Sequence, residues 1–486
     1  MDPKEKKQKL DTSEIASPSL SKTQHLKVKK KKTKKQKNQK ITSPSLDLSK
    51  NQDLVIASPS LDLSKNQDLV IASPSLSKID VGEAMKKQND VAIFLAEKVI
   101  SAVAKNSNFV FSPASINAVL TMVAASCGEE GEELRSFILS FLRSSSTDEL
   151  NAVFHKIASV VLADGSKQGG PKIAAVNGVW IDQSLPVSPL LKDLFENFFK
   201  ADLAQVDFRS KVNISNSMFF ILLIIFGSPF GCGFVTMCFY FVVLKAEEVR
   251  MEVNSWASSH TNDLIKDLLP RGSVTSLTDC VYGNALYFKG AWADKFQKSM
   301  TKRKPFYLLN GTSVSVPFMR SSSKQYIEAY DGFKVLSLPY RAGCGDRDFS
   351  MYFYLPDDKK GGLDNLLKKM TSTPEFLDSH IPESKVNVGK FRIPKFKIEF
   401  GFEASSIFND FELDVSLYQK SLIEIDEEGT EATTFTRGGL RGCCILKKTL
   451  DFVADHPFFF LIREDQTGTV LFAGQIFDPS KSSSSA

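Results

Sequence analysis

The stretch Ile423–Cys444, IEIDEEGTEATTFTRGGLRGCC, joins two different kinds of sequence. It begins as a strand in which Ile423 and Ile425 alternate with glutamates, and it then passes into the acidic turn Asp426–Gly429. Residues 430–444 contain almost no bulky apolar side chain, so this segment cannot bury itself in a core. We therefore expect an exposed loop here, and exposed loops carry function more often than they carry packing.

Four motifs in a fixed order resemble the serpin family, and the plant serpins in particular. They are FVFSPASIN from Phe109, NALYFKGAW from Asn284, EEGTEA from Glu427 and DFVADHPFFFLI from Asp451. The resemblance covers residues 79–479. It implies an α+β fold in which about nine helices surround three β-sheets, with an exposed reactive-centre loop near the C-terminus. In that family the loop is bait for a protease and, once cut, inserts as an extra strand into a large sheet.

The motif LRG, which ends at Gly442, resembles the cleavage site of plant serpins that bait Arg-specific proteases. The resemblance thus implies a reactive bond between Arg441 and Gly442. The implied partners are Arg-specific serine or cysteine proteases of trypsin-like, papain-like or metacaspase-like type. Counting forward from Gly429 by the usual family spacing instead places the cut after Cys443, so the bond between Cys443 and Cys444 is the alternative.

The resemblance also implies a hinge at the base of the loop and a region where the main sheet parts. The hinge comprises Glu428, Gly429, Thr430, Glu431, Ala432, Thr433 and Thr434. The sheet-opening region comprises Ser112, Ser115, Asn117, Asn284 and Gln419. From the residues alone, Ser112 before Pro113 is good capping chemistry for a buried helix. Gln419 stands where the family usually has a His that helps to tie the sheet shut.

Two departures favour a serpin that is cleaved without trapping its protease. Arg441 lies twelve residues beyond Gly429, two fewer than the usual family spacing, and Gln419 replaces the usual His. A suicide inhibitor of Arg-specific endopeptidases is the leading hypothesis, and a non-inhibitory or substrate-like serpin is the first alternative. Catalytic motifs for nucleophilic, phosphate-binding, zinc or dinucleotide chemistry are missing from the sequence, so we expect no enzyme, no cofactor and no metal site. We expect Asp455 and His456 to point in opposite directions along a strand rather than to form part of a catalytic triad.

The run Met218–Leu244 has 27 residues without a charge, long enough for a membrane helix. However, the sequences on both sides of it resemble neighbouring serpin elements, and a span would put two parts of one sheet on opposite sides of a bilayer. We interpret residues 212–245 as an insert, either a retained intron or a gene-model error. All codons of its first residue, Val212, begin with the intron donor dinucleotide GT. A membrane-anchored protein held by residues 218–244 remains the alternative from another class.

Residues 1–78 are rich in Lys, Ser, Gln and Asp and lack aromatic residues, so we expect them to be disordered. SPSLDLSKNQDLVIA occurs there twice in tandem, from Ser43 and Ser58, and a third copy begins at Ser73. Lys27–Lys40 holds nine lysines in fourteen residues, a pattern typical of a nuclear-import signal, of non-specific phosphate contact, as with chromatin, or of a merely solvated tail. No aromatic residue interleaves these lysines, so we expect no specific nucleic-acid recognition. Residues 480–486 are expected to form a loose tail.

Charge and cysteine usage indicate the compartment. Residues 1–80 hold 17 Lys and 9 acidic residues, whereas the rest holds 44 basic and 47 acidic residues, so the basic character belongs to the head. The seven cysteines are scattered without a disulfide or zinc pattern, and MDPKEKKQKL lacks the apolar core of a secretory signal. We expect a monomer in the cytoplasm, the nucleus or both. Export to the extracellular space by a leaderless route, as in the wider serpin family, is the alternative.

Overall fold

The computed structural model describes residues 79–128, 131–209, 231–343, 347–408, 416–429 and 449–481, with only the backbone described for 231–244, 405, 406 and 416. All of these residues belong to one of the two units of the chain, residues 57–486. The predicted extension 1–78, residues 482–486 of the tail and residues 212–230 of the predicted insert lie outside the described residues. None of the helices in the described part of the chain has the length and apolar character needed to cross a bilayer.

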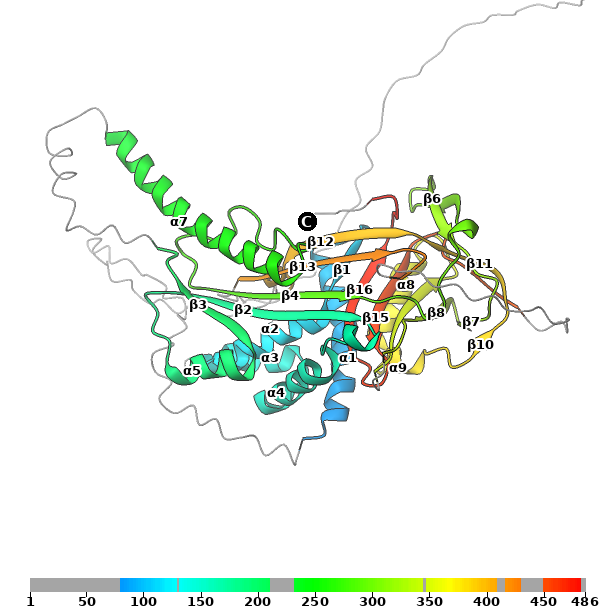
Figure 1. Ribbon diagram of the computed structural model, residues 1–486, viewed down its shortest axis with the longest axis horizontal. Helices are drawn as coiled ribbons and strands as arrows, with labels where there is room; N and C mark the ends of the chain where they lie inside the picture. Colours follow the sequence, from blue (N-terminus) through cyan, green and yellow to red (C-terminus); the bar gives the residue numbers. More distant parts are fainter. Residues whose placement is uncertain are drawn as a thin grey trace, which may run out of the picture. The chain divides into compact units, whose positions relative to one another are not determined.

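A five-stranded sheet leads into the predicted loop, with its strands in the order β12-β13-β4-β2-β3 (Figure 1). β2 and β4 are antiparallel over ten residue pairs and β12 and β13 over eight, whereas β13 and β4 run parallel. β13 is the last strand before the acidic turn, so this sheet positions the base of the loop. The strands are β12 (Phe396–Glu403), β13 (Ser416–Ile425), β4 (Cys280–Lys289), β2 (Lys172–Asp182) and β3 (Ala201–Val206).

β4 is buried on both faces, as its nearly continuous apolar sequence predicts. Successive side chains of a strand point to opposite faces. Tyr282 therefore packs into the main core on the side of α2 (Pro113–Ser126), whereas Val281 and Ala285 pack into a second cluster with α7 (Gly231–His260). Figure 1 shows α2 and α7 on opposite sides of this sheet.

The other two sheets complete the predicted three-sheet architecture. A seven-stranded sheet comprises, in order, β1 (Phe109–Phe111), β16 (Val470–Ile476), β15 (Phe458–Glu464), β9 (Phe349–Pro356), β8 (Phe333–Pro339), β7 (Gln325–Tyr330) and β10 (Lys385–Val386). A four-stranded sheet comprises β14 (Leu450–Val453), β11 (Val388–Pro394), β6 (Ser313–Met319) and β5 (Lys302–Tyr307). The α+β prediction with three β-sheets is confirmed.

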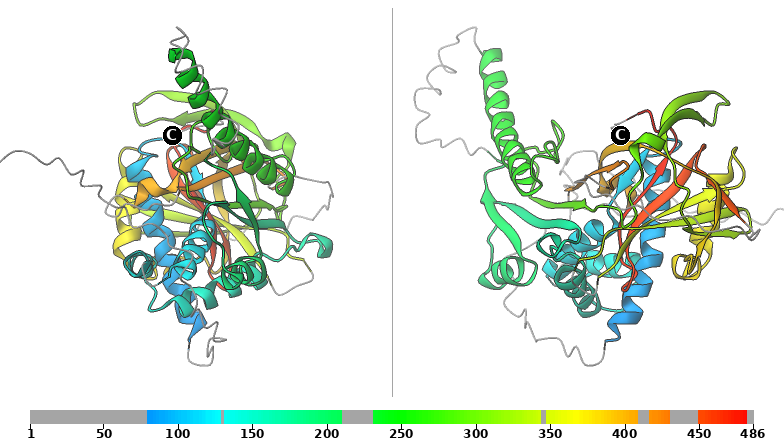
Figure 2. Two further views of the ribbon diagram at one scale, coloured as in Figure 1. Left: turned by 90° about the vertical axis from the view of Figure 1, so that its left-hand side faces the viewer. Right: turned by 45° about the vertical axis from the view of Figure 1, so that its right-hand side comes forward.

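Helices cover these sheets, and α2 begins at the cap that the sequence predicts. The Ser112 hydroxyl caps α2, and Pro113 occupies its first position. α1 (Val81–Ala102) is capped in the same way by Asp80, and it lies beside the red strands β15 and β16 in Figure 2. The remaining α-helices of the described residues are α3 (Glu132–Phe141), α4 (Thr147–Lys156), α5 (Pro189–Asp193), α8 (Gly362–Ser372) and α9 (Phe376–Ser379).

Candidate functional site

The acidic turn after β13 is held by hydrogen bonds to the segment that follows β4. The Trp292 backbone N–H donates to the carbonyl oxygen of Glu428, and its indole Nε1–H donates to that of Asp426, both at 2.9 Å. The Phe296 N–H donates to the carbonyl oxygen of Glu427, also at 2.9 Å. Three successive carbonyl groups are thereby fixed, so the loop departs from a rigid base.

The Glu427 side chain is only 3% exposed and is paired inside the protein. Its carboxylate accepts hydrogen bonds from Lys395 Nζ at 2.7 Å and Thr301 Oγ1 at 2.6 Å. Burial by itself raises the pKa of Glu427, but the hydrogen bonds from Lys395 and Thr301 outweigh it and hold this pKa below its usual value. Glu427 is therefore a buried, charged anchor of the turn.

Glu428 faces two lysines on the opposite side of the turn. Lys298 Nζ lies 2.6 Å and Lys295 Nζ lies 3.7 Å from its carboxylate oxygens. The hydrogen bond from Lys298 lowers the pKa of Glu428, and the same contact raises the pKa of Lys298. Both glutamates of the turn are thus neutralised locally, which keeps the turn from repelling an acidic partner.

Gly429 is the last described residue before the loop, and its backbone position admits only glycine. Its φ of 127° lies in a region that side-chain-bearing residues rarely adopt. It pairs with Ala291, and a Cβ atom at Gly429 would lie 2.3 Å from the carbonyl oxygen of Gly290. A larger residue at Gly429 would therefore strain the base of the loop.

The junction between β13 and β4, which we call the seam, is the weakest join of the five-stranded sheet. In the described part of the chain its parallel ladder has three register pairs, which end at Tyr418 and Gly283. The flanking antiparallel ladders have eight and ten pairs. Parallel pairing is also slightly less stable per residue than antiparallel pairing. The seam is therefore the join of this sheet that the fewest ladder hydrogen bonds hold together.

Two amide side chains lie beneath the seam on the α2 side of the sheet. Gln419 of β13 is 5% exposed, and its Nε2 donates to the carbonyl oxygen of Ser112 at 2.8 Å. Asn284 of β4 donates to Asn177 Oδ1 at 2.7 Å, and Asn177 of β2 donates to the carbonyl oxygen of Phe199 at 3.0 Å. Each amide thus ties its strand to a neighbouring element other than the strand across the seam.

The predicted sheet-opening residues are brought together only in part. The Ser112 hydroxyl accepts from the Ser115 N–H at 3.1 Å, as expected of a buried helix cap. Asn117 lines the same cavity as Ser115 and Asn284, but its Nδ2 donates to Gln88 of α1 at 2.6 Å. Sequence reasoning missed Asn177, whose signal was an amide in the middle of an otherwise apolar strand.

The predicted reactive bonds lie outside the described residues. Arg441, Gly442, Cys443 and Cys444 belong to this group, as do the hinge residues Thr430, Glu431, Ala432, Thr433 and Thr434. The structure does describe the two ends of the segment. Its first end follows the five-stranded sheet at Gly429, and its second end leads into β14, which pairs in parallel with β11 of the four-stranded sheet. The loop is therefore anchored on two different sheets.

Asp455 and His456 do meet, contrary to the expectation that they point apart along a strand. The chain bends between β14 and β15, so adjacent side chains are free to turn toward each other. His456 Nδ1 lies 2.9 Å from Asp455 Oδ1, and Nε2 lies 2.7 Å from the carbonyl oxygen of Pro356. Both ring nitrogens face oxygen acceptors of the buried structure, so His456 is occupied in packing.

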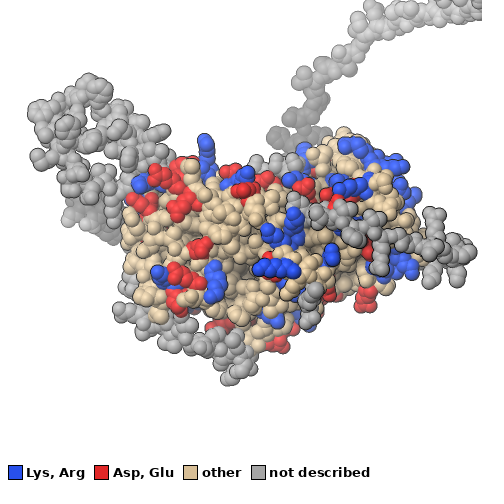
Figure 3. Space-filling model, in the orientation of Figure 1, with Lys and Arg blue, Asp and Glu red and all other residues tan. Residues whose placement is uncertain are grey.

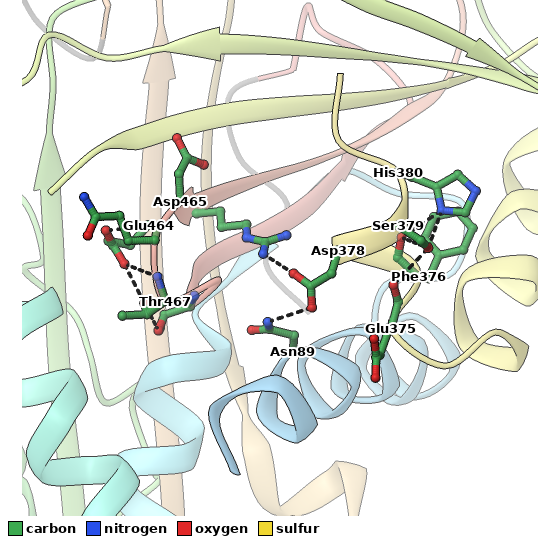
Figure 4. Close-up of polar contacts among 12 residues, drawn as sticks. Asn89, Glu375, Phe376, Asp378, Ser379, His380, Glu464, Asp465 and Thr467 are labelled. Carbon is green, nitrogen blue, oxygen red and sulfur yellow. Dashed lines mark hydrogen bonds and ion pairs between the residues drawn. The ribbon is translucent and has the colours of Figure 1, made fainter. Parts of the chain in front are cut away.

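A second polar cluster joins α1, α9 and the β15–β16 hairpin (Figure 4). Arg463, which is buried, forms an ion pair with Asp378, and Asn89 donates to the same carboxylate at 3.5 Å. Glu464 accepts from the backbone and hydroxyl of Thr467 at 2.8 and 2.5 Å. These contacts satisfy charges where three elements meet, which is a structural role.

Figure 3 shows both signs of charge spread over this face, with Lys and Arg gathered at the end that carries β5 and β6. Lys302, Arg303 and Lys304 of β5 are exposed there. Among the described residues, no three or more His, Cys, Asp or Glu side chains are arranged to hold a metal ion.

Comparison with known proteins returns one family. The protein-family model described as "Serpin (serine protease inhibitor)" matches residues 86–218 and 241–479 of this chain. The chain is 70% identical to "Probable non-inhibitory serpin-Z5" of Arabidopsis thaliana, over 99% of this chain and 100% of that protein. It is 59% identical to "Serpin-Z2" of the same plant, over 100% and 99%.

Among solved structures, the chain is similar to Arabidopsis AtSerpin1 in its native stressed conformation. The TM-score is 0.70 and the sequence identity is 44%, over 83% of this chain and 100% of that one. Human thyroxine-binding globulin, at 19% identity and a TM-score of 0.64, shares the fold over 82% of this chain and 100% of its own.

Proposed function

Because this chain belongs to the serpin family, we propose that it offers the bond between Arg441 and Gly442 to Arg-specific serine or cysteine proteases. The cut loop then enters the five-stranded sheet at the seam. The observation that carries this proposal is the three-pair seam, whose strand β13 leads directly to the pivot at Gly429. The LRG motif supports it as well, because an exposed Arg441 suits the acidic specificity pocket of an Arg-specific protease.

The chemistry belongs to the attacking protease. Its nucleophile attacks the carbonyl carbon of Arg441, the amine of Gly442 leaves with a proton, and an ester or thioester joins the two proteins. Insertion of the freed segment adds ladder hydrogen bonds on both sides of the seam, and Gly429 supplies the change of direction. Trapping succeeds when insertion is faster than hydrolysis of this acyl-enzyme.

A second candidate function is a serpin that is cleaved without trapping, or that does not inhibit at all. The relative named "Probable non-inhibitory serpin-Z5" supports this candidate, because it is 70% identical over nearly the whole chain. The short spacing between Gly429 and Arg441 supports it as well. A strand gains about 3.3 Å per residue, so two missing residues shorten the tether by roughly 7 Å. With a shorter tether the captured protease must be distorted more, or insertion must stop early so that water completes hydrolysis of the acyl-enzyme.

Incubation with trypsin and with an Arg-specific plant cysteine protease tests the proposal. An SDS-stable complex and a released peptide that begins at Gly442 indicate an inhibitor. Cleaved product with a large rise in Tm indicates insertion without trapping, and cleaved product with an unchanged Tm indicates that the seam does not accept the loop. A peptide that begins at Cys444 moves the bond to the alternative position. Arg437→Ala is the matched control, because it removes another arginine of the loop and should leave the Gly442 peptide unchanged.

A further inference from the structure

The N-terminal extension contains an apolar run close to the first helix. Leu69–Ala72 is one of only two runs of four consecutive apolar residues within residues 1–78, and the other is its duplicate Leu54–Ala57. The run at 69–72 belongs to the same unit of the chain as the described residues, and it ends eight residues before Asp80, the cap of α1. Apolar side chains are more stable when covered than in water, so this run gains free energy from a partner surface.

A groove lies directly beside the point where the described chain begins. It has a volume of about 1060 Å³ and lies between the first turns of α1, the second half of α4, Phe198 and the β15–β16 turn. Its apolar lining comprises Val81 and Met85 of α1, Ala152 of α4 and Phe198. Small-molecule pockets have volumes of about 300–1,000 Å³, so this groove suits an extended peptide segment better than one small molecule.

One polar side chain of the groove lacks a partner. Asn151 of α4 lines the groove, and its Oδ1 is a buried acceptor without a hydrogen-bond partner in the described part of the chain. A buried acceptor without a donor costs free energy comparable to a lost hydrogen bond. Backbone N–H groups are donors of the required kind, and every residue of Leu69–Ala72 has one. A peptide segment therefore supplies the missing donor.

The charges at the two sides of the groove suit the charges that flank the apolar run. Lys156 is exposed at the end of α4 and lines the groove. On the opposite side, Glu83 lies in the first turn of α1. In the extension, Asp68 directly precedes the apolar run, and Lys78 lies between the run and α1. A segment that runs from α4 toward α1 therefore brings an opposite charge to each side, and opposite charges attract.

The tether between the apolar run and the groove is long enough to reach and short enough to favour docking. An extended chain spans at most about 3.3–3.6 Å per residue, so the eight residues from Ala72 to Asp80 span roughly 28 Å. α1 and α4 are in contact, and the axes of packed helices are about 8–10 Å apart. A short linker gives an effective concentration of about 1 mM. An intrinsic Kd of about 0.1 mM is therefore enough to hold the docked and free states at about ten to one.

We propose that Leu69–Ala72 docks in this groove as an extended segment, with its apolar side chains against Val81, Ala152 and Phe198. One backbone N–H of the segment donates to Asn151 Oδ1. The docked segment joins α1 to α4 and covers apolar surface of both helices. Neither the loop nor a protease takes part, so failure of this proposal leaves the proposed protease function unaffected.

Amide hydrogen exchange of the full, uncut chain tests the proposal, because the chain contains a control of the same sequence. Peptides 51–63 and 66–78 are identical over their first eleven residues and differ in their last two, so mass spectrometry distinguishes the two copies. Amides of residues 69–72 should exchange about tenfold more slowly than those of residues 54–57, the factor that ten-to-one occupancy of the docked state gives. Equal exchange rates in the two copies would overturn the proposal.

Variants of the extension test the contact from one side without changing the folded body. Leu69→Ser combined with Ile71→Ser should make the amides of α4 that line the groove exchange faster, because the docked segment no longer covers them. The same two changes in the duplicate, Leu54→Ser with Ile56→Ser, are the matched control and should leave α4 unchanged. Equal effects of the two pairs would contradict the assignment of the run at 69–72.

Variants of the groove test the contact from the other side. Phe198→Ser should raise the exchange rate of residues 69–72 to that of residues 54–57. Phe94→Ser is the control, because Phe94 is also partly buried but does not line the groove. Slow exchange that persists in Phe198→Ser would place the segment elsewhere. Protection that rises with protein concentration would place it on a second molecule and contradict docking within one chain.

Discussion

At the scale of single residues, the base of the loop depends on a glycine and a buried glutamate that have different physical roles. Gly429 is required by its backbone angle and by the close approach of the chain after β4. Glu427 is required by its charge, because Lys395 and Thr301 meet it inside the protein. Each role leads to a measurable expectation with a control in the same chain.

Gly429→Ala should destabilise the uncut protein by about 2–4 kcal/mol, because the new Cβ atom adds a clash with the Gly290 carbonyl to the cost of a positive φ. Gly311→Ala is the control. Gly311 has a φ of 83° and nothing within 4 Å of an added Cβ, so its cost should be about 1 kcal/mol. Urea unfolding measures both. Equal losses would mean that the turn moves freely away from Gly290.

Glu427→Gln should cost about 1–3 kcal/mol at pH 7, because it removes the charge from hydrogen bonds in a buried site. The folded pKa of Glu427 lies below its unfolded value. The charged carboxylate therefore stabilises the folded state above about pH 4.5, and this stabilisation is lost as the pH falls through the folded pKa. The difference between wild type and variant should therefore vanish in acid.

Glu424→Gln is the matched control for that change. Glu424 also pairs with a lysine, Lys397 at 2.9 Å, but both side chains are about half exposed at 47% and 50%. Exposed pairs contribute about 0–1 kcal/mol, so this variant should unfold almost like the wild type. Similar losses for the two variants would contradict the assignment of Glu427 as the anchor.

At the scale of elements, the β15–β16 hairpin contains a carboxyl group that burial makes reluctant to ionise. Ser350 and Tyr352 donate to Asp465 at 2.6 and 2.8 Å. Asp465 and the adjacent Glu464 are labelled in Figure 4. Burial raises the pKa of Asp465 to about 6, although these hydroxyls and the nearby Arg463 lower it and Glu464 raises it further. The hairpin end should therefore respond to mild acid.

The folded pKa of Asp465 lies above its unfolded value of 3.8, so the folded state holds this proton more tightly. Its contribution to stability is greatest below pH 4 and is lost as the pH rises through about 6. Asp465→Asn keeps an acceptor for both hydroxyls without titrating. Relative to this variant, the wild type should lose about 2–3 kcal/mol between pH 4 and pH 7, measured by urea unfolding. If the difference in unfolding free energy between the wild type and the variant stays constant across this range, the raised pKa of Asp465 is wrong.

At the scale of the whole molecule, the two flanks of the predicted insert converge. Phe208, just before it, and Ala246, Val249 and Val253, just after it, share one apolar cluster with Trp180. A short connection would therefore be enough to join Phe208 to Ala246 in place of residues 212–245. The family model also leaves residues 219–240 unmatched, within the uncharged run.

We expect the main mature transcript to lack codons for about Val212–Lys245. Sequencing cDNA across codons 205–250 from expressing tissue checks this, with the codons for β4 as an internal control for coverage. If every transcript carries the run and the protein fractionates with membranes, the insert hypothesis fails and the membrane-anchored alternative gains support.

The lysine run at 27–40, which lies outside the described residues, carries our proposal for localisation. A fusion of residues 1–80 to a fluorescent reporter should enter the nucleus, because nine lysines on a polar segment suit an import receptor. A variant in which every lysine within residues 29–35 is replaced by Gln should be distributed evenly between nucleus and cytoplasm. A reporter that is evenly distributed before the replacement leaves only the solvated-tail interpretation.

The sequence by itself determined what depends on neighbours along the chain. The nearly continuous apolar sequence of β4 predicted its burial on both faces, and Ser112 before Pro113 predicted the cap of α2. The order of the four motifs was sufficient to indicate the serpin family, and the family in turn implied the three sheets. These features are local because periodicity and capping act within a few residues.

Only the tertiary structure decided the site beneath the loop. Gln419 reaches a carbonyl 307 residues away, Asn284 an amide 107 residues away, and Trp292 a carbonyl 134 residues away. The three-pair seam and the role of Asn177 follow from which strands become neighbours. Periodicity places a side chain on one face of its strand, but its hydrogen-bond partner depends on how distant segments pack. Hydrogen bonds act over about 3 Å in space, whatever the separation of the two residues in sequence.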